Sequence, residues 1–214
     1  MPGRGLRSAS PPPSLVLYDS PVSGNCYKVR LLLAHLGIRY ERQTMDVIDS
    51  SNRPEVLGGL NPSLRVPTIV LDDGRPLAES NAILWYFGEG TRFVPSDAYE
   101  RAQMLQWMFF EQYEHEPAIA VARFWLAYSG KPKKEFEERL PGWTKAGHRA
   151  LAAMEGHLNG RDYLVDGGLT LADISLYAYT HVAHEGGFEL ERYPAVRRWL
   201  ERVASEPGHV PIDA

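Results

Sequence analysis

The hydrophobic residues of the first 90 positions change between two spacings, which predicts short strands interleaved with helices. The apolar run at 14–19 (SLVLYD) is typical of a strand, and a turn-forming loop follows it. Apolar side chains at helical spacing then continue to Gly37, a residue that favours a helix end. Partial alternation predicts a second strand at 38–47, and a short irregular helix is predicted at 51–60.

The segment 61–80 (NPSLRVPTIVLDDGRPLAES) predicts a hairpin that runs directly into a helix. Pro67 stands in a run of β-forming residues, and because proline lacks the N–H that a strand interior donates, we expect it at the start of the strand. Asp73-Gly74 is typical of a two-residue hairpin turn. Glu79-Ser80 then stands at the expected helix start, where outward-pointing backbone N–H groups favour a carboxylate and a hydroxyl.

A change in composition separates this part of the chain from the rest. Residues 88–95 (GEGTRFVP) contain two glycines and a proline and have no period, which is typical of a linker. We therefore expect one domain at 14–90, a linker at 91–96 and a second domain at 97–214.

The second domain is predicted to be all-helical. Ser96 is the expected N-cap of a long helix that runs to about Tyr128, provided that Pro117 only kinks it. A further helix is predicted at 133–158, and Pro141-Gly142 is a candidate interruption.

Thr170 and Asp173 form the clearest local signal in this half. A threonine followed three residues later by a carboxylate, just before an apolar run, is typical of a capping box at a helix start. We interpret this pair as a folding element, and we expect the last helix to begin near Tyr193.

Composition narrows the possible functions. The net charge of −4, without a basic block, does not suit nucleic acid, and no apolar run approaches the roughly 20 residues that span a bilayer. A single cysteine excludes an internal disulfide framework and favours a reducing, cytoplasmic location. Residues 1–13 lack an apolar signal core and predict a disordered tail.

The order of these motifs resembles the glutathione S-transferase superfamily, in particular its bacterial, serine-type members of the theta/nu kind. The resemblance rests on Val66-Pro67 at a strand start, the hairpin, Glu79-Ser80 at a helix start and the later capping box, and it covers 14–206. It implies an α/β plus all-α architecture: an N-terminal thioredoxin-like βαβαββα domain followed by a C-terminal all-helical domain. It also implies glutathione as co-substrate and a homodimer.

The resemblance assigns glutathione contacts to the same segment. It implies that Val66 pairs through its backbone with the cysteinyl unit, that the bond before Pro67 is cis, and that Glu79 and Ser80 hold the γ-glutamyl end. Arg65 is a candidate for the glycyl carboxylate, and an exposed surface arginine is equally compatible with its position.

The glutathione sulfur must be held as a thiolate, although a free thiol has a pKa of about 8.5. Ser23 matches the catalytic hydroxyl of serine-type transferases, which donates a hydrogen bond to sulfur; the alternative is that it only caps the first helix. Asn25 is the second candidate. The run SGNCYKV at 23–29 partly matches the Thr-Pro-Asn-Gly-x-Lys-Val pattern of glutathione-dependent disulfide-bond reductases, which would make Ser23 and Asn25 partners at the sulfur.

Two neighbours are weaker candidates. Cys26 lies near a helix N-terminus, where thiolates are favoured, but we interpret it as buried and inert. Tyr18 lies roughly where tyrosine-type enzymes carry their donor, and core packing is the favoured alternative.

The second substrate would lie against the first long helix of the helical domain, near Trp107, Phe110 and Tyr113. Aromatic residues at helical spacing also belong to ordinary cores, so both interpretations remain open. The histidines have no metal-ligand spacing with cysteines, and no metal is expected.

The predicted function is conjugation of the glutathione thiolate to small, electrophilic, mostly apolar compounds. The first alternative is glutathione-dependent reduction of disulfides or peroxides, which the partial match at 23–29 favours. An isomerase is disfavoured because its serine- and cysteine-rich loop is absent from the sequence. A binding module without turnover is the remaining alternative, since fold does not determine activity.

Overall fold

The computed structural model describes residues 15–214, so the tail expected at 1–13 lies outside the described residues. The N-terminal domain has the predicted βαβαββα order, which confirms the expected fold class. Its elements are β1 (Val16–Asp19), α1 (Gly24–His35), β2 (Glu41–Thr44), α2 (Arg53–Leu57), β3 (Thr68–Val70), β4 (Pro76–Ala78) and α3 (Ser80–Gly88).

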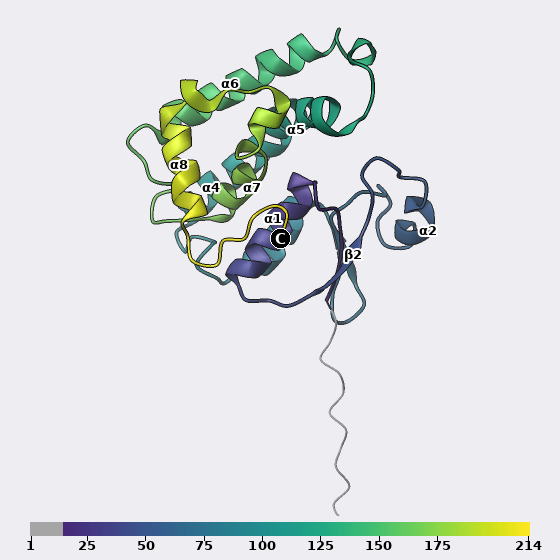
Figure 1. Cartoon of the computed structure of the whole chain (residues 1–214). Helices are drawn as coiled ribbons and strands as arrows, with labels where there is room; N and C mark the ends of the chain where they lie inside the picture. The colour runs from purple at the N-terminus through teal and green to yellow at the C-terminus, as the bar shows by residue number, and fades with distance from the viewer. Residues whose placement is uncertain (1–14) are drawn as a thin grey trace, which may run out of the picture.

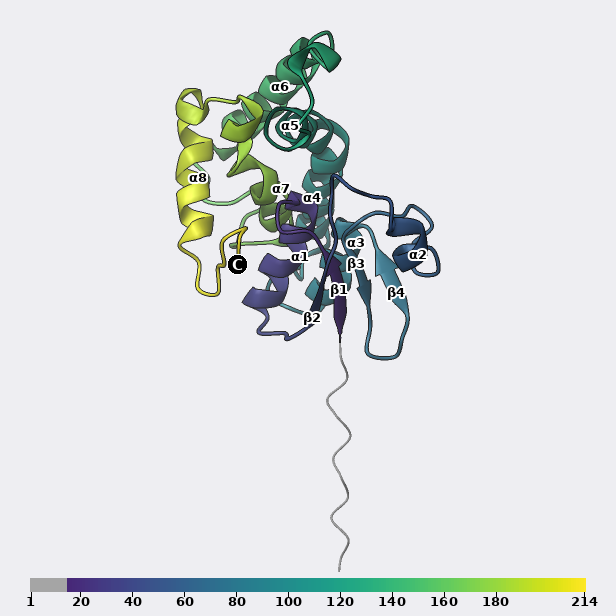
Figure 2. The same cartoon turned by 45° about the vertical axis from the view of Figure 1, so that its right-hand side comes forward.

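The four strands form one mixed sheet in the order β2-β1-β3-β4. β1 and β2 are parallel, and the β1–β3 and β3–β4 pairs are antiparallel. Apolar residues of β1, α1, β3 and α3, together with Leu15 just before β1, form the core of this domain: Leu15, Leu17, Val29, Leu33, Ile69 and Ile83. Figure 2 shows α1 and α3 beside the sheet and the β3–β4 hairpin at its outer edge.

The hairpin turn is one residue longer than the two-residue turn predicted for Asp73-Gly74. The Leu71 N–H donates to the Arg75 carbonyl at 2.9 Å, which leaves a three-residue loop at 72–74. Gly74 has a φ of 84°. A three-residue hairpin loop ends on a residue in this left-handed region, where glycine is favoured.

The C-terminal domain is helical, as predicted. Its elements are α4 (Ala98–Phe110), the π-helical turn η1 (Glu111–His115), α5 (Glu116–Arg123), the π-helical turn η2 (Phe124–Tyr128), η3 (Lys133–Glu135), α6 (Leu140–Leu158), α7 (Leu171–Thr180), η4 (Ala183–Gly186), η5 (Leu190–Arg192) and α8 (Pro194–Ala204). Figure 1 shows these helices on one side of the N-terminal domain.

The long helix expected from Ser96 to about Tyr128 is continuous from α4 to η2, but its N-cap is Asp97. The Asp97 carboxylate accepts from the backbone N–H groups of residues 99 and 100 at 2.9 and 3.0 Å, a position Ser96 does not reach. Pro117 lies just after η1. Proline lacks the N–H that an α-helix donates four residues back, and the wide π turn stands directly before it.

α7 is the central helix of the C-terminal domain, and all ten of its residues are buried. The predicted capping box of Thr170 and Asp173 is present at its start. The fully buried Asp173 carboxylate accepts from the Leu164 N–H, the Thr170 N–H and the Trp199 indole N–H, each at 2.9 Å. α7 packs against α1 and α4, so this carboxylate helps to fix the contact between the two domains.

The C-terminal segment returns to the N-terminal domain. The Tyr27 hydroxyl on α1 donates to the Val210 carbonyl at 2.6 Å, and Arg30 donates to the Ile212 carbonyl. Figures 1 and 2 both place the C-terminus beside α1. Among residues 15–214, every helix is too short or too polar to cross a bilayer.

Candidate active site

A polar pocket lies where the two domains meet. It is lined by the start of α1, the loop before β3, the start of α3 and the helix segment around η1: Asn25, Asn61, Arg65, Val66, Pro67, Glu79, Ser80, Gln112 and Glu116. The structure therefore brings together Asn25 and the five residues for which glutathione contacts were predicted, although they come from separate parts of the sequence.

The loop before β3 is fixed by a buried asparagine. Asn61 is 4% exposed, and its side-chain amide donates at 3.0 Å to both the Arg65 carbonyl and the Thr68 hydroxyl. The Val66-Pro67 bond is cis, and β3 begins directly after it. This arrangement holds Val66 at the wall of the pocket.

Glu79 takes an unusual backbone conformation at the start of α3. Its φ is 68° and its ψ is 114°, in a region that non-glycine residues rarely adopt. Its side chain is exposed at the pocket and carries a negative charge where the N-terminal N–H groups of α3 favour one. Strain of this kind is typical of functional sites.

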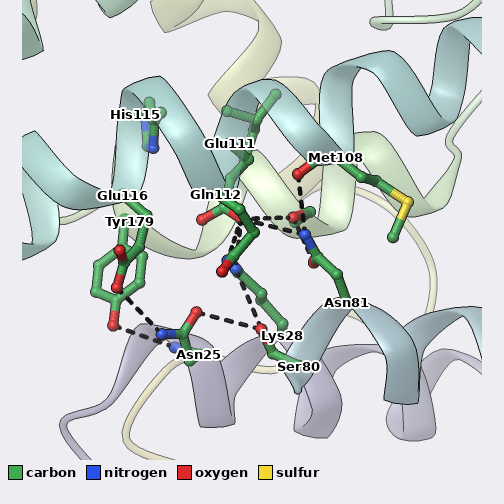
Figure 3. A network of polar contacts seen from close by, with 12 residues as sticks. Asn25, Lys28, Ser80, Asn81, Met108, Glu111, Gln112, His115, Glu116 and Tyr179 are labelled. Carbon is green, nitrogen blue, oxygen red and sulfur yellow. Dashed lines mark hydrogen bonds and ion pairs between the residues drawn. The ribbon is translucent and has the colours of Figure 1, made fainter.

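Asn25 lies in the first turn of α1, and each of its polar groups has a partner. Its side-chain oxygen accepts from the Ser80 hydroxyl at 3.3 Å, and its Nδ2 donates to Glu116 Oε1 at 3.3 Å. Its backbone N–H donates to the Tyr179 hydroxyl of α7, also at 3.3 Å. Figure 3 shows this side chain between Ser80 and Glu116. Burial raises the pKa of the Glu116 carboxyl, while Lys28 and the Asn25 hydrogen bond oppose the rise.

Ser23 is the N-cap of α1. Its hydroxyl accepts from the Cys26 N–H at 3.3 Å, and its side chain is not among those that line the pocket. The loop before it is held by the helical domain, because Arg123 of α5 donates to the Val22 carbonyl at 2.6 Å. The same arginine pairs with Glu185 at 2.9 Å.

Cys26 is fully buried, and burial raises the pKa of its thiol to about 12. It is therefore a neutral thiol at physiological pH, in agreement with the inert, buried cysteine that we predicted. Tyr18 lies in β1 opposite Thr68 and is not among the residues that line the pocket.

Gly24 departs from the reductase pattern, which has proline at this position. A Cβ atom at Gly24 would lie 2.6 to 2.7 Å from three ring atoms of Tyr179, closer than any side chain tolerates. The Tyr179 ring of α7 thus occupies the space that a proline ring would need. The packing of the helical domain against α1 therefore explains why position 24 is glycine and not proline.

The three aromatic residues predicted to wall a second-substrate pocket do not line this one. Trp107 is 7% exposed and packs in the core, with ring centroids 5.1 Å from Phe110 and 4.6 Å from His157. Tyr113 is 82% exposed. From the same long helix, Gln112 and Glu116 line the pocket instead. They lie within and directly after the π-helical turn η1, which a regular helical period does not anticipate.

A buried ion pair lies behind the pocket and was not predicted. Lys28 Nζ is 2.7 Å from Glu111 Oε2, and both side chains are 0% exposed. Glu111 Oε2 also accepts from Gln112 at 2.8 Å, and Ser175 of α7 lies 3.2 Å from it. Figure 3 shows how α1, α3, η1 and α7 converge on this carboxylate. The two residues of the ion pair are 83 positions apart and come from different domains, so no local sequence pattern links them.

The described residues contain no group of three or more histidine, cysteine, aspartate or glutamate side chains arranged to hold a metal ion. The polar groups of the pocket are instead three amides, one hydroxyl, one guanidinium and two carboxylates. Such a set can bind a zwitterionic ligand that carries both carboxylates and an ammonium group.

Comparison with known proteins identifies the family. Residues 22–89 match the model of the glutathione S-transferase N-terminal domain, and 107–207 match that of the C-terminal domain. A crystal structure of a glutathione S-transferase from Pseudomonas fluorescens is 47% identical, with a TM-score of 0.89, over 92% of this chain and 98% of that one. The chain belongs to the glutathione S-transferase family.

More distant relatives differ in what their names describe. The disulfide-bond oxidoreductase YfcG of Escherichia coli is 29% identical over 90% of this chain and 91% of its own length. A glutathione transferase from Pseudomonas putida, solved with one glutathione disulfide bound per subunit, is 25% identical over 94% of this chain and 90% of that one, with a TM-score of 0.81. Elongation factor 1-gamma of Artemia salina is 30% identical over 86% of this chain, which spans only 43% of that relative.

Proposed function

We propose that the polar pocket binds glutathione. Val66 would pair through its backbone with the cysteinyl unit, and Glu79 and Ser80 would hold the γ-glutamyl end. Arg65 would bind the glycyl carboxylate, because its exposed guanidinium stands at the pocket rim. The proposal is carried by one observation: all five of these predicted contacts, including Pro67, line a single pocket with Asn25.

Asn25 is our preferred donor to the glutathione sulfur. The Ser23 hydroxyl is engaged as a helix cap and lies outside the pocket, whereas Asn25 lines it. An amide nitrogen carries two hydrogens, and one of those on Asn25 goes to Glu116. The second is available to a thiolate, whose hydrogen bond would lower the pKa of the bound thiol.

The reaction that this geometry favours is glutathione-dependent disulfide reduction. Asn25, which lines the pocket, belongs to the run at 23–29 that partly matches the pattern of glutathione-dependent disulfide-bond reductases, whereas the Ser23 hydroxyl caps α1. The bound thiolate would attack one sulfur of a disulfide, form a mixed disulfide with it and release the other sulfur as a thiolate. A second glutathione thiolate would then release the remaining thiol and form glutathione disulfide. The names of the E. coli and P. putida relatives are in keeping with this assignment.

Conjugation of glutathione to small electrophiles is the second candidate. It uses the same thiolate and the same pocket, and it is favoured by the relative of 47% identity, whose name is glutathione S-transferase. In this reaction Ser23 would be the serine-type donor of a theta/nu-like enzyme, and detoxification would be the expected role. A binding module without turnover is the third candidate, because fold does not determine activity. The similarity to elongation factor 1-gamma supports this candidate.

A homodimer in the cytoplasm is the assembly and location that we propose. Phe109 and Tyr113, four residues apart on the long helix, are 70% and 82% exposed. Two large aromatic side chains on one exposed face are typical of an interface. Phe109→Glu should therefore convert a dimer to a monomer in light scattering, and an unchanged dimer mass would place the interface elsewhere.

The test of function combines binding with two assays on the wild type, Asn25→Ala and the matched variant Ser23→Ala. Calorimetry measures glutathione affinity, and thiolate absorbance measures the pKa of the bound thiol. We expect a depressed thiol pKa in the wild type and Ser23→Ala but not in Asn25→Ala. Reduction of 2-hydroxyethyl disulfide should exceed conjugation of 1-chloro-2,4-dinitrobenzene.

Other outcomes would select another candidate. Loss of the pKa shift in Ser23→Ala alone would favour the serine-type transferase. Conjugation faster than disulfide reduction would favour the second reaction. A wild type that binds glutathione without turnover in either assay would favour the binding module, and no glutathione binding would refute the proposed site.

A further inference from the structure

The buried ion pair behind the pocket contains a lysine for which the proposed reaction has no role. Lys28 Nζ lies 3.4 Å from the Ser80 hydroxyl oxygen, in addition to its 2.7 Å contact with Glu111. Removing two charges from water is costly, and a buried pair is weak evidence for added stability. Its position is more informative, because Lys28 is one hydrogen bond away from a pocket residue (Figure 3).

The hydrogen bonds from Lys28 towards the pocket have a fixed direction. An ammonium group has three donors and no acceptor, so the Ser80 oxygen must accept from Lys28. The Ser80 hydroxyl hydrogen then points to the Asn25 side-chain oxygen, 3.3 Å away. With its oxygen held on this side, Asn25 presents its NH2 group to Glu116 and to the pocket.

The other neighbours of Asn25 do not fix this orientation. A serine hydroxyl both donates and accepts, so Ser80 alone would suit either end of the amide. Glu116 accepts when ionised and donates when protonated, and burial raises the pKa of its carboxyl. Of the residues linked by these hydrogen bonds, Lys28 is the one whose ammonium group can only donate. The Glu111 carboxylate lies 2.7 Å from this ammonium group and compensates its charge.

We propose that Lys28 is a positioning residue that sets the orientation of the Asn25 amide, so that an amide N–H faces the glutathione sulfur. The inference rests on the proposed function, in which Asn25 is the sulfur donor. Lys28 itself touches no substrate and acts through Ser80. The helical domain takes part, because Glu111 supplies the carboxylate that compensates the lysine charge.

The test removes the ion pair as a whole, with Lys28→Met/Glu111→Leu, because loss of Lys28 alone would leave a buried carboxylate unpaired. We expect this variant to fold and to bind glutathione through Val66 and Glu79 within about threefold of the wild type. The pKa of the bound thiol should rise by about one unit or more towards the free value of about 8.5. At neutral pH, kcat should fall about 3- to 30-fold with little change in KM, because the thiolate fraction falls as the thiol pKa approaches about 8.5.

Ser175→Ala is the matched control. The Ser175 hydroxyl also contacts Glu111, at 3.2 Å, but it lies outside the path from Lys28 to Asn25. This variant should keep the wild-type thiol pKa. If the double variant does not fold, Lys28→Gln/Glu111→Gln preserves polarity and volume. A neutral amide can turn either end to Ser80, so the same loss of the pKa shift is expected.

A double-mutant cycle distinguishes positioning from a structural role. In an Asn25→Ala background, removal of the ion pair should not change the bound-thiol pKa further, because the amide through which Lys28 acts is gone. A folded ion-pair variant with the wild-type thiol pKa would refute this inference and leave the proposed function intact. An Asn25→Ala variant with the wild-type thiol pKa would refute this inference together with the assignment of Asn25 as the sulfur donor, whereas absence of glutathione binding would refute the proposed site.

Discussion

Substitution of Glu79 by glycine should relieve backbone strain and so favour stability, while it weakens glutathione binding. Its φ of 68° and ψ of 114° lie in a region that costs a non-glycine residue on the order of 1–3 kcal/mol. Glycine adopts positive φ freely but is about 0.5–1 kcal/mol more costly to order from the unfolded chain. Glu79→Gly should therefore be up to about 2 kcal/mol more stable than the matched variant Glu79→Ala.

The comparison between these two variants isolates the backbone. Both remove the carboxylate, and with it the same favourable interaction of about 0.3–1 kcal/mol with the start of α3. Both should also weaken glutathione binding about 10- to 100-fold, since a hydrogen bond to a charged group is worth about 1.5–3 kcal/mol. Urea unfolding measures the difference in stability, and calorimetry measures the loss of affinity.

Two results would refute this reasoning in different places. If Glu79→Gly is less stable than Glu79→Ala by about 0.5–1 kcal/mol, the cost of glycine alone, the backbone at Glu79 stores no strain. If both variants bind glutathione as the wild type does, the Glu79 carboxylate is not part of the site. A stabilised variant without affinity would instead indicate that the strain is retained for function.

Three further predictions concern folding. Gly24→Ala should cost about 1–3 kcal/mol in urea unfolding, because its Cβ would overlap the Tyr179 ring, and the cost should vanish in a Tyr179→Ala background. Asp173→Ala should lower stability by about 3–5 kcal/mol, since it leaves several buried donors without an acceptor, and a variant that unfolds normally but fails to bind glutathione would contradict this folding role. Burial lowers the pKa of His115 and of His181 from 6.5 to about 4, so both bind protons more weakly in the folded state. Stability present above pH 6.5 should be lost as the pH falls towards 4, by a few kcal/mol at about 1.4 kcal/mol per pKa unit; a flat urea midpoint across that range would contradict it.

The part of the fold that follows from local chemistry was predictable. Pro67 before a strand, a glycine in the hairpin and Glu79-Ser80 at a helix start each act over a few residues, so the sequence alone locates them. The predicted hairpin loop was one residue too short, because Asp73-Gly74 suits more than one loop length. Only the φ of Gly74, 84°, and the Leu71 to Arg75 hydrogen bond distinguish the three-residue loop.

The helix face that meets the pocket was not predictable from a regular period. A 3.6-residue spacing groups Trp107, Phe110 and Tyr113, and it does not anticipate the π turn at Glu111–His115. A π turn adds a residue to one helical turn and so rotates the following face by about 100°. Gln112 lies within this turn and Glu116 directly after it, and both line the pocket.

The ion pair of Lys28 and Glu111 lay beyond sequence reasoning for a different reason. Its partners are 83 residues apart and come from different domains, so no local pattern connects them. Each charge taken alone is compatible with a solvent-exposed helix face. Only the packing of α1 against α7 and the long helix buries both.

The same packing limits how this protein can be recombined with its relatives. Lys28 and Val22 belong to the N-terminal domain, yet their partners Glu111 and Arg123 belong to the helical one. A chimaera that exchanges the helical domain at the linker would leave a buried cation without its carboxylate and the Val22 carbonyl without its donor, unless both partner positions are carried over. For this protein, domain shuffling is thus a problem of matched residue pairs across the junction, rather than of where the chain is cut.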